Sequence, residues 1–327
     1  MRCFVTGIGG FVGLHLAEAL LAAGHEVGGM VQRSEGTVGL RELAGRHARF
    51  EAASVAVGDV TDRASIERAL AAWTPDRVFH LAAIAYAPRA EADPGRTLAV
   101  NVLGTIHVLD AAHAAAPAAR VLIAGSSEAY GAVGAEELPI VERTALRPVS
   151  LYGVSKAAAD LAAFERWWTL RYPVVRVRAF NHTGPGQSAD FVCSDFARQV
   201  ARIEAGLAPP VLRVGNLEAR RDFSDVRDIV RGYALLAERG EIGEAYNLCS
   251  GQAVSIGRIV EILSAESTVA IRCEEEGRRT RANEIPVVVG DAGRAAALGW
   301  RPAVPLQQTL RDLLHDWRRR IASNAAV

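Results

Sequence analysis

The sequence predicts an α/β fold, a doubly wound parallel sheet followed by a smaller C-terminal α/β lobe. Strand-like and helix-like segments alternate through the first 130 residues, and such alternation gives a parallel sheet with helices on both faces. Glycines also cluster between the first strand and the first helix, as they do in nucleotide-binding Rossmann domains. The chain has 327 residues, half of them apolar, which is enough for two hydrophobic cores.

The elements of the first domain follow from hydrophobic runs bounded by turn residues. Gly24 ends the first helix, and Asp62 or Thr61 caps the next helix that follows a strand. The expected strands are Cys3–Thr6, Glu26–Val31, Ser54–Val57, Arg77–Leu81 and Arg120–Ala124. The expected helices are Phe11–Ala23, Asp62 to about Trp73, and Arg96–Ala115.

The second half begins with a long helix at Ser150–Tyr172 and a strand at Val174–Arg178. After it the chain is richer in Pro, Gly and Arg. Further helices are expected at Ser194–Ala205, Val226–Glu238, Ile256–Ser264 and Leu306–Arg320. We therefore predict a dinucleotide-binding domain over residues 1–180 and a substrate lobe mainly over 181–327. A return to the first domain is expected near residues 220–250.

Composition excludes several classes of protein. Basic and acidic side chains number 37 each, so a broad basic surface for nucleic acid is not expected. No 18 consecutive residues are apolar, and a strand-like run follows Met1 directly, so we expect neither a membrane span nor a signal peptide. The four cysteines form no C-x-x-C pair. We therefore expect no metal site and a cytoplasmic location.

The glycine turn indicates dinucleotide binding. Gly7, Gly10 and Gly13 are spaced G-x-x-G-x-x-G around Phe11 and Val12, after a strand and before a helix. Glycine lets the turn be tight and lets backbone N–H groups approach a pyrophosphate at the helix N-terminus.

The end of the second strand bears on the choice of cofactor. An NAD site usually has an acidic residue there for the ribose 2′-hydroxyl, but this chain has Gln32 and Arg33. Because a guanidinium pairs with a 2′-phosphate, we expect NADP(H) to be preferred, with NAD(H) as the alternative.

A tyrosine–lysine pair predicts oxidoreductase chemistry. Tyr152 and Lys156 lie on one helix face, and a neighbouring ammonium, together with an oxidised nicotinamide when one is present, lowers the pKa of a phenol toward the working range. Ser126 and Ser127 follow a strand, where ligands bind in α/β sheets. Ser126 is expected beside the reacting oxygen. Glu128 is a candidate base for a C–H proton, or a solvated loop carboxylate.

With these motifs the sequence resembles the extended short-chain dehydrogenase/reductase family over nearly its whole length. The resemblance is carried by Thr6-Gly7-x-x-Gly10-Phe11-x-Gly13, Asp59-Val60, His80-Leu81-Ala82-Ala83, Asn101-Val102-x-Gly104-Thr105, Ser126 and Tyr152-x-x-x-Lys156. It implies that Asp59, Val60, Leu81, Ala82 and Ala83 contact the cofactor. Tyr152, Lys156 and Ser126 would take part in hydride and proton transfer, and Tyr152 and Lys156 would also contact the cofactor.

The C-terminal lobe looks like the GDP-mannose branch of that family. The matching segments are Phe180–Gln187, Val214–Phe223, Asp225–Asp228 and Tyr246–Gly251. Within the branch, Gly125–Gly131 and Arg221–Val226 are more similar to C4 reductases than to 4,6-dehydratases. The implied reaction converts GDP-4-dehydro-6-deoxy-D-mannose to GDP-D-rhamnose. A GDP-mannose 4,6-dehydratase using Glu128, and a reductase that gives the 6-deoxytalose epimer, remain alternatives.

The resemblance also implies substrate contacts and an assembly. Arg221 and Arg281 would bind the diphosphate of a GDP-sugar, and Glu284 the guanosine ribose. Asn181 would lie by the pyrophosphate or the sugar, and Ser127 would also contact the substrate. Ala282 stands where the family pattern has Pro. A homodimer is expected, since the helix carrying Tyr152 often pairs across a two-fold axis in this family.

Overall fold

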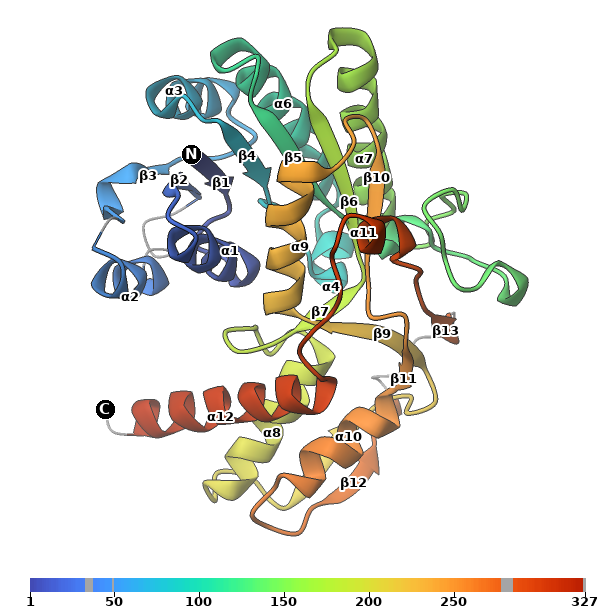
Figure 1. The fold of residues 1–327 in the computed structure, drawn as a ribbon. Coiled ribbons are helices and arrows are strands. Elements are labelled where there is room, and N and C mark those ends of the chain that lie inside the picture. Colours follow the sequence, from blue (N-terminus) through green and yellow to red (C-terminus); the bar gives the residue numbers. More distant parts are fainter. Residues whose placement is uncertain (33–37, 49, 278–284, 326–327) are drawn as a thin grey trace.

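The computed structural model describes residues 1–32, 38–48, 50–277 and 285–325. Over these residues a seven-stranded sheet has the order β10-β6-β5-β4-β1-β2-β3 (Figure 1). Each neighbouring pair is parallel, which confirms the predicted fold class. The strands are β1 (Arg2–Thr6), β2 (Glu26–Val31), β3 (Val55–Val57), β4 (Arg77–His80), β5 (Arg120–Ser126), β6 (Val174–Ala179) and β10 (Ala245–Leu248).

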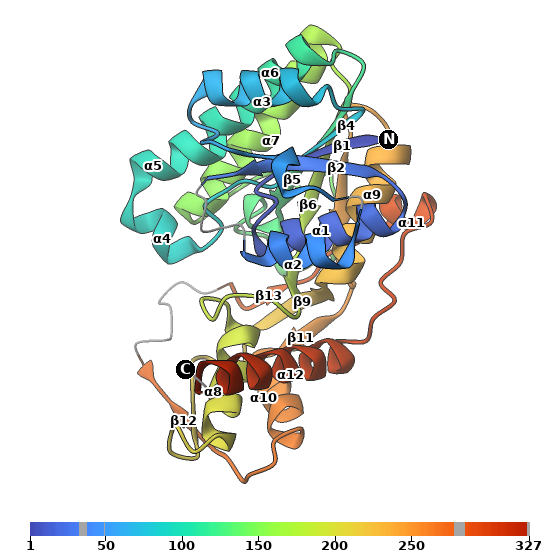
Figure 2. The same cartoon turned by 90° about the vertical axis from the view of Figure 1, so that its left-hand side faces the viewer.

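Helices cover both faces of the main sheet (Figure 2). Each layer packs its apolar side chains against the strands in a separate core. One layer contains α1 (Phe11–Ala22), α2 (Val38–Arg46) and α9 (Val226–Arg239). The other contains α3 (Arg63–Trp73), α6 (Gly104–Ala115) and α7 (Leu151–Leu170).

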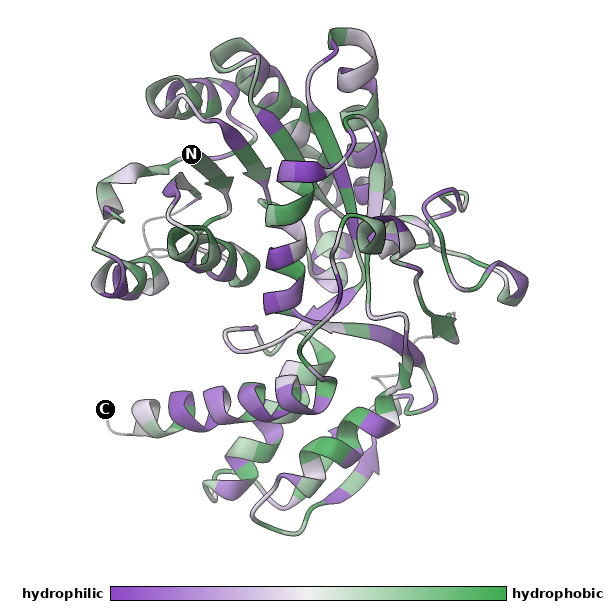
Figure 3. Cartoon of the chain, viewed as in Figure 1, coloured by the Kyte–Doolittle hydropathy of each residue, from purple (hydrophilic) through white to green (hydrophobic). Residues whose placement is uncertain are grey.

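The C-terminal lobe has its own core between small sheets and three helices. Apolar residues are concentrated in the strands of the main sheet, whereas α12 is largely hydrophilic (Figure 3). The lobe's strands are β7 (Asn181–Thr183), β8 (Val211–Val214), β9 (Arg220–Asp225), β11 (Ala253–Ser255), β12 (Arg272–Glu275) and β13 (Val287–Val288). Its helices are α8 (Val192–Glu204), α10 (Ile256–Ala265) and α12 (Leu306–Ala325).

The chain passes between the main domain and the C-terminal lobe several times. After β9 it returns to the main domain, where α9 packs on α1 and β10 forms the sheet edge beside β6. After β13 it returns again for the short helix α11 (Gly293–Ala297), which contacts β10 before the chain enters α12.

One expected helix is composite. In place of one α-helix over 96–115, the chain forms α5 (Pro94–Leu98), a π turn η3 (Ala99–Leu103) and then α6. Together they make an apolar helix of 22 residues, Pro94–Ala115, which by length and composition alone would be able to cross a membrane. Core helices of soluble proteins meet the same criterion, and here α6 packs against α3 and α7.

Candidate active site

The glycine turn between β1 and α1 has the geometry of a phosphate site. Gly7 has a φ of 73°, and a Cβ there would lie 3.0 Å from the backbone of Ala82. A Cβ on Gly13 would lie 2.2 Å from the Gly7 carbonyl oxygen, so α1 reaches the turn only with glycine there. No side chain caps α1 at Gly10. The first N–H groups of α1 are therefore left for an anion, and this cradle fits the pyrophosphate of a dinucleotide.

Asp59 organises the ends of β2 and β3. Its carboxylate accepts hydrogen bonds from the Thr61 N–H and from the Gln32 Nε2, each at 2.9 Å, and pairs with Arg96. Burial raises the pKa of Asp59, but these hydrogen bonds outweigh burial and hold the pKa well below its usual range. Sequence reasoning missed Arg96, because the contact joins segments 37 residues apart. The predicted phosphate-binding Arg33 lies outside the described residues.

The segment after β4 lies beside the glycine turn. The Leu81 N–H donates to the Thr6 carbonyl, and the Ala82 N–H to the Thr6 hydroxyl. The buried His80 ring contacts the hydroxyls of Thr6 and Thr105, at 2.8 and 3.0 Å. Burial, with Lys156 nearby, lowers the pKa of His80 to about 3, so this imidazole is neutral and structural.

Ser126, Tyr152 and Lys156 come together at the carboxyl end of β5. Ser126 ends β5, and Ser150 caps α7 by accepting a hydrogen bond from the Gly153 N–H at 3.0 Å, which fixes the turn carrying Tyr152. The Tyr152 and Ser126 side chains share a hydrogen bond. One turn on, the Lys156 Nζ donates to the Ala124 carbonyl at 2.7 Å. A phenol, a hydroxyl and an ammonium therefore surround one strand end.

The pKa values depart from the sequence-based expectation. Burial raises the pKa of Tyr152 to about 12; the hydrogen bond with Ser126 lowers it only in part, and the charge of Glu128 raises it further. Burial lowers the pKa of Lys156 to about 8. The expected lowering of the phenol pKa by Lys156 is therefore wrong for the protein groups alone. Desolvation dominates because Lys156 is buried and Tyr152 is largely shielded from water.

The remaining predicted residues are dispersed around this centre. Ser127 is buried, while the neighbouring Glu128 is exposed. Asn181 is half-buried on β7, and Arg221 lies on β9, where its guanidinium donates to the Arg220 carbonyl at 2.9 Å. Two predicted substrate residues, Arg281 and Glu284, lie outside the described residues. Val60 is buried against α6 at Gly104, and Ala83 precedes Ile84 in the segment after β4.

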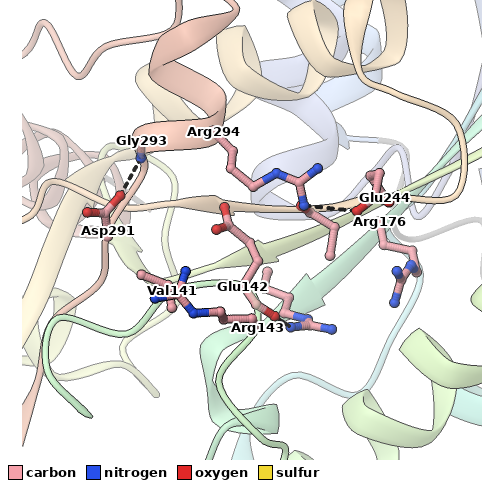
Figure 4. Close-up of a pocket in the computed structure, with 10 residues that line it drawn as sticks. Val141, Glu142, Arg143, Arg176, Glu244, Asp291, Gly293 and Arg294 are labelled. Atoms are coloured by element: carbon pink, nitrogen blue, oxygen red, sulfur yellow. Dashed lines mark hydrogen bonds and ion pairs between the residues drawn. The ribbon is translucent and has the colours of Figure 1, made fainter. Parts of the chain in front are cut away.

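A polar cavity lies away from this centre. It measures about 440 Å³ and occupies the β6–β10 edge of the sheet (Figure 4). No predicted site residue lines it. Three of the arginines that line it are already in ion pairs: Arg176 and Arg178 both pair with Asp160, and Arg294 pairs with Glu244. Within the part of the chain that the structure describes, no group of His, Cys, Asp and Glu side chains could hold a metal ion.

Known proteins resemble this chain along almost its whole length. Residues 4–313 match the family model described as GDP-mannose 4,6 dehydratase. GDP-6-deoxy-D-mannose reductase of Pseudomonas aeruginosa is 36% identical over 98% of each chain. GDP-mannose 4,6 dehydratase of Homo sapiens is 28% identical over 95% of this chain and 90% of its own.

Solved structures agree with the sequence matches. The structure of RMD from Pseudomonas aeruginosa complexed with NADPH has a TM-score of 0.85 and 35% identity, covering 98% of this chain and 99% of that one. UDP-glucose 4-epimerase of Thermus thermophilus in complex with NAD has a TM-score of 0.84 and 26% identity, covering 97% and 99%.

Proposed function

Because the chain belongs to the GDP-mannose 4,6-dehydratase family of extended short-chain dehydrogenases/reductases, we propose that it reduces the C4 keto group of GDP-4-dehydro-6-deoxy-D-mannose to give GDP-D-rhamnose. It is an NAD(P)-dependent nucleotide-sugar oxidoreductase. The observation that carries the proposal is the grouping of Tyr152, Ser126 and Lys156 at the strand end beside the glycine turn.

The site geometry accounts for the reduction. A bound nicotinamide supplies the hydride that C4 receives. Tyr152, which is protonated at neutral pH because its pKa is about 12, donates its proton to the C4 oxygen. The Ser126 hydroxyl donates a hydrogen bond to the same oxygen as negative charge develops there. Lys156, in the same helix and charged below pH 8, stabilises that charge and holds the cofactor ribose.

Turnover tests the proposal. Purified protein mixed with NADPH and the 4-keto-6-deoxy sugar nucleotide should oxidise NADPH, measured by loss of its near-ultraviolet absorbance, and NMR should identify the product as the rhamno or the talo epimer. A protein that leaves NADPH unchanged with this substrate would refute the reductase function.

A 4,6-dehydratase is the second candidate, favoured by one observation. Glu128 is exposed next to Ser126, where a carboxylate is able to remove a proton from C5. In that case GDP-mannose with NADP⁺ should give a 4-keto-6-deoxy product without net change in cofactor, and Glu128→Gln should abolish this reaction. If GDP-mannose is unchanged, the dehydratase candidate fails.

The cofactor preference is proposed from the sequence and from a related structure. Arg33, two residues beyond β2 in the sequence, suits a 2′-phosphate. The Pseudomonas aeruginosa structure contains NADPH, while the Thermus thermophilus epimerase contains NAD. We expect Arg33→Ala to raise the KM for NADPH about tenfold, as one lost charge-assisted pair implies, and to leave the KM for NADH unchanged. Equal effects on both cofactors would contradict this preference.

We further propose how the substrate is held, how the chain assembles and where it acts. Arg221, Arg281, Asn181 and Glu284 are proposed to hold the GDP-sugar, and a homodimer is proposed to form through α7. The described cysteines are free, including the exposed Cys273. Free thiols suit a reducing cytoplasm, and cell fractionation tests that location.

A further inference from the structure

Two ring contacts join the main domain to the C-terminal lobe among the described residues. Phe11, at the glycine turn, stacks on His182 of β7 with centroids 6.4 Å apart. Tyr86, just before α4 (Ala87–Ala92), meets Phe191 edge-on at 6.0 Å, immediately before α8. The first contact belongs to the cofactor turn. The second lies outside every predicted site residue, and its role is open.

The segment 82–86 runs from the cofactor turn to the catalytic helix. At its start Ala82 lies against Gly7. At its end α4 is tied to α7, because the Leu151 N–H donates to the Glu91 carboxylate at 2.7 Å, one residue before Tyr152. The segment leaves β4, whose neighbour β5 ends at Ser126. It therefore borders the space where the sugar must meet both the phenol and the cofactor.

At the middle of this segment the backbone groups are already hydrogen-bonded and are not available to a ligand. The Ile84 N–H donates to Asn101 Oδ1 at 2.8 Å, and the Ile84 carbonyl accepts from Asn101 Nδ2 at 3.0 Å. The side chains from Leu81 to Ala85 are all apolar, and Phe191 approaches Tyr86 from the other lobe. A methyl group gives up no hydrogen bond when it packs against such a surface, whereas a hydroxyl would lose its hydrogen bonds to water.

We propose that Tyr86 and Phe191 complete an apolar wall against C6 of the bound sugar and so select 6-deoxy sugars over sugars with a C6 hydroxyl. The inference rests on the proposed function for the GDP-sugar class. It assigns the discrimination at C6 to a contact that forms only when the two lobes meet.

A pair of ligands that differ only at C6 tests the wall. GDP-D-rhamnose and GDP-mannose share every other group, so calorimetric titration of each into the NADP⁺-loaded enzyme isolates the C6 hydroxyl. The wild type should bind GDP-D-rhamnose roughly 10- to 100-fold more tightly, the discrimination that an apolar pocket achieves. Tyr86→Ala and Phe191→Ala should each reduce this ratio at least about fivefold.

Two controls separate the wall from general damage. Tyr86→Phe keeps the ring and should keep the wild-type ratio. GDP alone lacks the sugar, so its affinity should be the same in all these variants. If an alanine variant does not fold, Phe191→Leu serves instead, with a smaller but measurable loss of the ratio because part of the apolar surface remains.

Failure of the wall and failure of the reductase function give different results. Equal affinity of the wild type for the two ligands overturns the wall, even where NADPH oxidation supports the reductase. An unchanged ratio in both alanine variants also overturns it. A preserved C6 preference without NADPH oxidation refutes the reductase function and leaves the wall standing.

Discussion

At the residue scale, burial favours the uncharged form of both members of the pair Tyr152 and Lys156. It raises the pKa of the phenol to about 12 and lowers that of the amine to about 8. A neutral phenol is the proton donor that reduction of a ketone requires at neutral pH. The pair was recognisable from its spacing combined with the glycine turn and Ser126, but the directions of both pKa shifts depend on burial, which a motif does not encode.

Tyr152→Phe removes the proton donor and keeps the ring. We expect kcat for keto-sugar reduction to fall by roughly 10²- to 10⁴-fold, the usual contribution of a general acid, while the Kd for NADPH, measured by fluorescence, stays constant. Tyr172→Phe is the matched control, since it removes a phenolic hydroxyl that lies away from the site, beside His113 and the Ala116 carbonyl. A Tyr152→Phe enzyme with wild-type kcat would show that another group donates the proton.

Lys156 is expected to lower stability at neutral pH. Its pKa is about 8 in the folded protein and about 10.4 when unfolded. Between these pH values the unfolded chain binds more protons than the folded protein. The unfolding free energy of the protein therefore rises with pH, by about 3 kcal/mol at most. Urea unfolding at pH 7 and at pH 10 should show the wild type gaining stability relative to Lys156→Met. A difference independent of pH would contradict the lowered pKa.

At the element scale, the π turn η3 positions Asn101 between two functional segments. Its amide holds both backbone groups of Ile84 and also donates to the Ser155 hydroxyl of α7 at 2.9 Å. π turns often occur at functional sites because the extra residue redirects a side chain. Here the redirected side chain fixes the segment after β4 to the helix that carries Tyr152.

Asn101→Ala should therefore affect both stability and chemistry. Loss of these hydrogen bonds, with buried partners left unpaired, should lower the unfolding free energy by about 2–4 kcal/mol. We also expect a larger effect on kcat than on the KM for NADPH. The reason is that Asn101 binds Ile84 and the helix that carries Tyr152, and not the glycine turn. Chemical denaturation and steady-state kinetics measure the two effects, and an unchanged kcat would make the contact purely structural.

Helices and strands were predictable from the sequence where neighbouring residues determine them, and not where distant contacts do. The helix after Asp62 was predictable, because the Asp62 carboxylate accepts a hydrogen bond from the Ala64 N–H as an N-cap. The helix α2 was not foreseen, since Gly39 and Gly45 weaken its local propensity. The π turn has no local signal at all, and the contact between Tyr86 and Phe191 joins segments 105 residues apart that only the folded chain brings together.

At the scale of the whole molecule, large apolar side chains are exposed on neighbouring elements. The elements η3 and α7 contact one another, and Leu103, Leu161 and Trp168 on them are 51–58% exposed. Exposed apolar side chains on adjacent elements are a feature of interaction surfaces. This exposure supports the proposed homodimer, which the composition of α7 alone did not distinguish from an internal core face.

Light scattering on the purified protein should therefore give twice the chain mass of 34.8 kDa. Leu161→Glu places a charge among these apolar side chains and should give the single-chain mass. Leu207→Glu, at an equally exposed leucine of the C-terminal lobe, is the matched control and should remain dimeric. A wild-type protein that is monomeric at micromolar concentration contradicts the dimer.

The repeated passage of the chain between its two lobes bears on how such proteins diversify. Since α9, β10 and α11 lie in the main domain but follow parts of the C-terminal lobe in the sequence, no single recombination point separates the lobes. A gene chimera joined near residue 180 would inherit mismatched partners for β6 and α1. New sugar specificities on this scaffold are therefore expected to evolve by local substitution within the lobe, and not by exchange of a transferable module.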